Sequence, residues 1–176
     1  MREKITHSEQ IYQGRIVNLT IHDVQLPNGA FSKRELVYHP GAVALVALDE
    51  ARNVLLVRQY RIAADQILLE IPAGTLKPGE DPEVCAIREL QEETGYKPGQ
   101  IERIGGIFVA PGYTTEFIHL FLATDLTGSV LAMDDDEFIE TERLPLEQAL
   151  ARIERGDIID GKSIAGLMLV ARRLGV

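Results

Sequence analysis

The sequence predicts a mixed α/β (α+β) protein: a mixed β-sheet between helices, with residues 1–40 as a small β-rich appendage and residues 41–176 as the main domain. Three observations lead to this fold class. A length of 176 residues, 45% of them hydrophobic, supports one ordinary core. Short apolar runs of strand length recur along the chain, and helical periodicity is confined to three segments.

The elements follow in order. Residues 15–25 alternate apolar and polar side chains, Pro27-Asn28-Gly29 supplies a turn, and residues 32–38 are again extended, which predicts a hairpin. After a turn at 39–41, strands are expected at 42–48, 53–60, 68–72, 101–110, 117–126 and 138–145. Amphipathic periodicity predicts two C-terminal helices, at 146–156 and 162–175.

The remaining helix, expected over 82–94, is unusually acidic. Asp81 suits the N-cap, Pro82 the first helical position and Gly95 a left-handed C-cap. The spacing i, i+3 and i+4 places three carboxylates on one face, and the apolar residues are expected to pack inward from the other. The carboxylates are Glu89, Glu92 and Glu93, and the apolar residues are Val84, Ile87 and Leu90.

Charge and composition exclude several classes of function. A net charge of −9 argues against a nucleic-acid binder, because phosphate backbones are bound by clustered Lys and Arg. No apolar run approaches the roughly 20 residues that cross a bilayer, and the first ten residues lack a signal-peptide core, so no membrane association is expected. Cys85 is the single cysteine, which fits a reducing compartment; we expect a cytoplasmic protein.

The three carboxylates need a compensating charge. Mg²⁺ is the simplest candidate, because it prefers oxygen ligands and shares its shell among carboxylates, water and phosphates. The competing interpretation is a solvated acidic surface helix with Arg88 pairing nearby, and composition alone favours that reading.

The spacing of the acidic residues favours a metal site over a solvated surface helix. Gly74, Glu80 and the run from Arg88 to Tyr96 (RELQEETGY) match position for position the signature of the Nudix hydrolase family, which this chain resembles over residues 10–170. The resemblance implies that Glu89, Glu92, Glu93 and the carbonyl of Ala73 hold Mg²⁺, for which Mn²⁺ can substitute. By the same resemblance we expect Glu92 to be a catalytic residue as well. Glu80 and Arg88 would brace the loop and helix by an ion pair.

Residues outside the signature indicate the substrate. The stretch 57–74 (VRQYRIAADQILLEIPAG) and the proline at position 111 resemble the ADP-ribose pyrophosphatase group. By that resemblance Arg34 and Arg61 contact the substrate. Arg58 is a further candidate, weighed evenly against a surface charge. Glu70 would be costly to bury alone, so we expect it to contact substrate, a metal-bound water or a loop amide.

The resemblance implies Mg²⁺-dependent hydrolysis of ADP-ribose to AMP and ribose 5-phosphate. Another nucleoside diphosphate sugar as substrate, or a non-catalytic ADP-ribose-binding module, stays open. In this group a glutamate on a loop acts as the general base. Alignment of the loop at 133–140 places that glutamate at Glu137, and Asp135 and Asp136 are the alternative candidates for the base. Residues 1–40 form too few strands to be stable alone. In the resembling group this segment crosses to a partner subunit, so we expect a homodimer formed through residues 1–40.

Overall fold

A computed structural model describes residues 1–129, 131 and 138–176. The chain forms two compact units, one made of residues 1–41 and 108–117, the other of residues 42–107 and 118–176. The second unit has a mixed sheet with helices on both faces, which confirms the predicted fold class.

The first unit is a three-stranded antiparallel sheet of β1 (Lys4–Gln13), β2 (Asn18–Gln25) and β3 (Phe31–Tyr38). The predicted β2–β3 hairpin is present, and its turn contains Gly29 at φ 86°, a left-handed conformation that suits glycine. Strand β1 was not predicted, because all ten of its residues are exposed and no buried face imposes an alternating pattern. Residues 108–117 join this unit through backbone hydrogen bonds between Val37 and both Tyr113 and Thr115.

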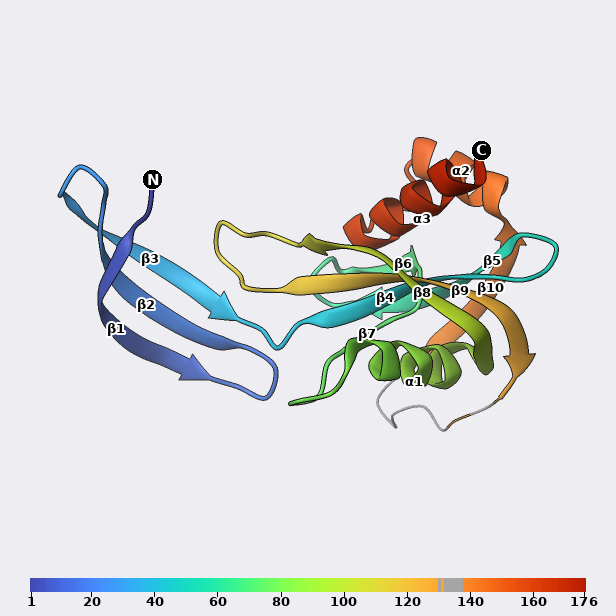
Figure 1. Ribbon diagram of the computed structural model, residues 1–176, viewed down its shortest axis with the longest axis horizontal. Helices are drawn as coiled ribbons and strands as arrows, with labels where there is room; N and C mark the ends of the chain where they lie inside the picture. The colour runs from blue at the N-terminus through green and yellow to red at the C-terminus, as the bar shows by residue number, and fades with distance from the viewer. Residues whose placement is uncertain (130, 132–137) are drawn as a thin grey trace. The chain divides into compact units, whose positions relative to one another are not determined.

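The second unit contains a seven-stranded sheet (Figure 1). Its main path runs β10-β5-β4-β9-β8, with β6 beside β5 and β7 beside β4. Strands β4 and β9 are parallel, whereas the pairs β10–β5, β5–β4, β6–β5 and β7–β4 are antiparallel. The strands are β4 (Ala42–Leu48), β5 (Asn53–Arg61), β6 (Gln66–Glu70), β7 (Ala73–Thr75), β8 (Tyr96–Phe108), β9 (Phe117–Gly128) and β10 (Ile139–Pro145).

Helices cover both faces of this sheet. Helix α1 (Pro82–Thr94) packs on one face, and α2 (Leu146–Glu154) and α3 (Gly161–Leu174) pack on the other, as Figure 1 shows. Side chains of β5 point alternately to the two faces of the sheet. Val54 and Leu56 pack in the core beneath α2 and α3, whereas Leu55 packs in the core beneath α1. This alternation decides which side chains can reach the carboxylates of α1.

Two predicted boundaries and one missed strand need correction. Strand β6 ends at Glu70, two residues before the predicted end, and the short β7 follows it unpredicted. Strand β8 begins at Tyr96, immediately after the helix, and not at position 101. Among the residues that the structure describes, no helix is long and apolar enough to cross a membrane.

Candidate metal and phosphate site

Helix α1 begins and ends where local sequence predicts. The carboxylate of Asp81 accepts hydrogen bonds from the N–H groups of Glu83 (2.9 Å) and Val84 (3.3 Å), and Gly95 ends the helix at φ 74°. The inward face differs from the prediction: Val84 is 59% exposed, while Cys85, Ala86 and Leu90 form the apolar contact. The buried face therefore lies closer to the carboxylates than the periodicity suggested.

Two of the carboxylates are buried against strand β7. Glu89 and Glu93 are 8% and 5% exposed. An Oε atom of Glu93 accepts a hydrogen bond of 3.0 Å from the N–H of Ala73, so the helix is fixed to the residue whose carbonyl was predicted to bind metal. Gly74 lies so close to Glu89 that a Cβ there would fall 1.8 Å from the carboxylate carbon. Only glycine leaves room for this packing.

Arg88 joins the loop to the helix. Its guanidinium donates to Glu80 at 3.0 and 3.1 Å, which confirms the predicted ion pair, and its Nη1 lies 2.7 Å from one oxygen of Glu89 and of Glu92. Hydrogen bonding to Arg88 lowers the pKa of Glu80 to about 2. Burial alone would lower the pKa of Arg88, but these three carboxylates outweigh burial and raise it. Glu80 and Arg88 are therefore both charged at neutral pH.

The donor atoms are of the type that a hard divalent cation prefers. Carboxylates from one helix lie against the Ala73–Gly74 backbone, which combines carboxylate and carbonyl oxygens as Mg²⁺ requires. Within the described residues, however, no three carboxylate, imidazole or thiol groups converge on one point, because Arg88 binds Glu89 and Glu92 while Glu93 bonds to Ala73. The prediction that Glu89, Glu92, Glu93 and Ala73 hold the ion stays a prediction.

Arg61 and Glu70 form a bidentate pair. Arg61 Nε and Nη2 donate to the two oxygens of Glu70 at 3.0 and 2.7 Å. The Glu70 side chain is only 2% exposed, and Lys162 of α3 contacts it as well. Burial would raise the pKa of Glu70, but its two cationic partners hold it below its ordinary value. The expected contact with a loop amide is absent from the described hydrogen bonds: cationic side chains satisfy this carboxylate.

The charge of Glu93 on α1 also acts on Arg61. The pKa of Arg61 is raised, mainly by the hydrogen bond to Glu70, with further contributions from the charges of Glu93 and Asp160. Arg61 thus connects the acidic helix to the N-terminal end of α3. Lys162 was not predicted as part of this site, because it is separated from Glu70 by 92 positions and no local motif marks it.

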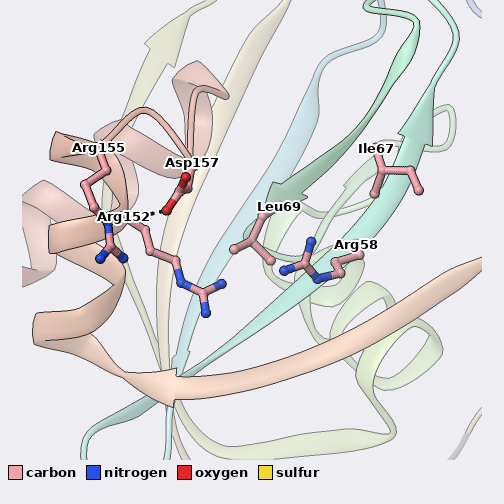
Figure 2. Close-up of a pocket in the computed structure, with 6 residues that line it drawn as sticks. All are labelled: Arg58, Ile67, Leu69, Arg152, Arg155 and Asp157. Carbon is pink, nitrogen blue, oxygen red and sulfur yellow. Dashed lines mark ion pairs between the residues drawn. The ribbon is translucent and has the colours of Figure 1, made fainter.

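Arg58 belongs to a different cluster. It pairs in register with Leu69, whose side chain packs in the core beneath α2 and α3, so Arg58 faces that layer and not α1. Its guanidinium binds Glu142 at 2.7 Å, and Arg152 of α2 binds the other oxygen of Glu142 at the same distance. Figure 2 shows both arginines beside Leu69 in a pocket of about 630 Å³. The role of Arg58 in substrate binding stays a prediction. The sheet lies between Arg58 and the carboxylates of α1.

The last two predicted positions lie elsewhere. Arg34 is in the first unit, on β3, where it pairs with Glu3 at 2.5 Å and donates to Ser32 at 3.1 Å. Glu137 lies outside the described residues, as do Asp135 and Asp136. The roles predicted for these residues stay predictions.

Comparison with known proteins agrees with this geometry. A NUDIX domain profile matches residues 37–167. The chain is 42% identical over 167 residues to the ADP-ribose pyrophosphatase of Bacillus subtilis strain 168, covering 93% of this chain and 89% of the relative. It is 44% identical over 164 residues to the methanol dehydrogenase activator of Bacillus methanolicus, covering 92% and 89%.

The fold agrees as well. The crystal structure of an ADP compounds hydrolase matches with a TM-score of 0.90 at 25% identity, covering 99% of this chain and 95% of the other. The matching profile spans most of the chain, and it includes the glycine, the glutamates and the arginine whose contacts build the acidic site. The chain therefore belongs to the Nudix hydrolase family.

Proposed function

We propose that the protein hydrolyses the pyrophosphate bond of nucleoside diphosphate sugars, with ADP-ribose as the substrate and AMP and ribose 5-phosphate as the products. The observation that carries this proposal is the packing of the α1 carboxylates against Ala73 and Gly74, with Arg61 nearby. The likeness to an ADP-ribose pyrophosphatase over nearly the whole chain supports the choice of substrate.

The proposed roles follow from charge. A pyrophosphate diester carries two negative charges, which a protein of net charge −9 repels unless cations are placed locally. Mg²⁺ held by Glu89, Glu92, Glu93 and the carbonyl of Ala73 would supply positive charge against the phosphate oxygens and acidify water.

The arginines act on the same anion by holding it. Arg61 presents the part of its guanidinium that Glu70 does not bind, and its side chain is 39% exposed, so it can hold a phosphate oxygen. Arg34 is proposed to contribute a second guanidinium, and Glu137 to take the proton from the attacking water. Positioning by the arginines lowers the barrier without their taking part in bond making.

A hydrolysis screen tests this proposal. ADP-ribose, GDP-mannose, UDP-glucose and NADH are incubated with the protein and Mg²⁺, with and without a chelator, and products are identified by phosphorus NMR. We expect ADP-ribose to give AMP and ribose 5-phosphate, with activity abolished by the chelator and restored by Mg²⁺ or Mn²⁺. Faster cleavage of another panel member would correct the substrate, and cleavage of none would reject the function.

A further inference from the structure

Lys162 of α3 contacts the site through Glu70. It is the second residue of the helix, its side chain is only 11% exposed, and its ammonium contacts an oxygen of Glu70 and an oxygen of Asp160, the latter at 2.9 Å. Glu70 in turn binds Arg61 through two hydrogen bonds. The substrate-side arginine is therefore connected to α3 through a single buried carboxylate.

The second cation changes the charge at Arg61. A buried carboxylate paired with one arginine would neutralise it, leaving little net attraction for a phosphate. Lys162 gives Glu70 a second cationic partner and also binds Asp160, so Arg61, Lys162, Glu70 and Asp160 together carry no net formal charge, whereas without Lys162 they would carry −1. The N–H and hydroxyl of Ser163, at the positive end of α3, stabilise the Asp160 carboxylate by hydrogen bonds, so removal of Lys162 would leave excess negative charge beside Arg61.

Lys162 also fixes the position of Glu70. Carboxylate oxygens of Glu70 and Asp160 contact the same ammonium, so without it two negative charges would face each other in a buried space. Repulsion would then displace Glu70 and the guanidinium that it holds. The neighbouring backbone is fixed independently: the N–H of Ile71 donates to the Ser163 hydroxyl at 2.8 Å.

We propose that Lys162 is a positioning residue for phosphate binding, which holds Glu70 in place and preserves the positive charge that Arg61 presents to the substrate. It touches neither the substrate nor the reacting atoms. This inference rests on the proposed function and adds to it a residue far from the Nudix signature in sequence.

Steady-state kinetics of five variants test it: Lys162→Met, Lys162→Arg, Arg61→Met, the double variant Lys162→Met/Arg61→Met, and the control Arg152→Met. The control removes another half-buried cation from an ion pair, with Glu142, on the face away from α1. The substrate is whichever panel member the wild type hydrolyses, at fixed Mg²⁺. Melting temperatures are measured in parallel, and Lys162→Gln replaces Lys162→Met if the latter fails to fold.

We expect Lys162→Met to raise KM about tenfold with kcat nearly unchanged, because the lost charge acts on binding. Lys162→Arg should restore most of the affinity. The double variant should be no worse than Arg61→Met, since both substitutions remove the same contribution. Arg152→Met should lower the melting temperature without changing KM.

Other outcomes separate the two proposals. A wild type that cleaves no member of the panel rejects the proposed function. An active wild type whose KM is the same in Lys162→Met overturns the positioning role. The positioning role is also overturned if the increases in KM add up in the double variant, or if Lys162→Arg does not restore KM. A purely structural lysine would give either result.

Discussion

Substituting Gly74 by alanine tests the closest packing in the site. The new Cβ would lie 1.8 Å from the carboxylate carbon of Glu89 and 2.1 and 2.3 Å from its oxygens. Ordinary contact begins near 3.4 Å, so the carboxylate would have to retreat by about 1.6 Å. It cannot retreat freely, because Glu89 is 8% exposed and pairs with Arg88 at 2.7 Å.

The expected losses follow from that displacement. Overpacking of a buried site costs typically 1–3 kcal/mol, and about 2 kcal/mol corresponds to a fall of roughly 4–8 °C in melting temperature for a chain of this size. Because a predicted metal ligand moves by more than 1 Å, we expect Mg²⁺ affinity to fall and kcat/KM to drop about 100-fold. Thermal unfolding, calorimetric titration with Mg²⁺ and hydrolysis kinetics measure the three effects.

Gly105→Ala is the matched control. Gly105 also lies in a strand of the same unit, and a Cβ there would make an ordinary contact of 3.5 Å with Leu169. We expect this variant to keep wild-type metal affinity and activity. If Gly74→Ala behaves like Gly105→Ala in all three measurements, the close approach of Glu89 to the β7 backbone has no functional consequence and the site has been misplaced.

Four further predictions concern other parts of the chain. Glu93→Gln should weaken Mg²⁺ and Mn²⁺ binding in calorimetry and greatly reduce turnover with the fold intact; unchanged affinity and activity would exclude Glu93 as a ligand. Because the pKa of Glu80 is about 2 against an ordinary 4.5, its contribution to stability is complete above pH 4.5 and is lost as the pH falls toward 2. Melting curves between pH 2 and 6 should therefore be less pH-dependent in Glu80→Gln, and parallel curves would contradict this. Glu137→Gln should lower kcat about 10²- to 10⁴-fold at nearly constant KM, whereas a kcat close to wild type would place the base elsewhere. The fully exposed β1 should contribute to a homodimer, and an active monomer of 19.5 kDa in light scattering would refute that.

The acidic helix could be predicted from sequence because its determinants are local. Asp81, Pro82 and Gly95 fix its ends within one turn, and the spacing of the glutamates fixes the face on which they gather. The ion pair of Glu80 with Arg88 was also predictable, since the family signature places both residues. Local chemistry therefore gives the position of the site and most of its charges.

Contacts between distant segments could not be predicted in the same way. Val84 looks like a core residue by periodicity but is exposed, because the helix turns Cys85 and Ala86 toward the sheet and keeps Glu89 and Glu93 against β7. Arg58 and Arg61 occur in one strand and look alike in sequence, yet the three-residue spacing sends them to opposite faces. These outcomes depend on which layer covers each face of the sheet.

The acidic helix raises the question of how its negative charge is compensated. Arg88 supplies one positive charge to Glu80, Glu89 and Glu92, and Arg61 is held mainly by Glu70. Glu93 adds a fourth carboxylate beside these three, and its charge also acts on Arg61. Packing and hydrogen bonding position these carboxylates but do not neutralise them. We propose a divalent cation as the partner that would remove most of the remaining repulsion, and its charge would then let a substrate phosphate enter this acidic region.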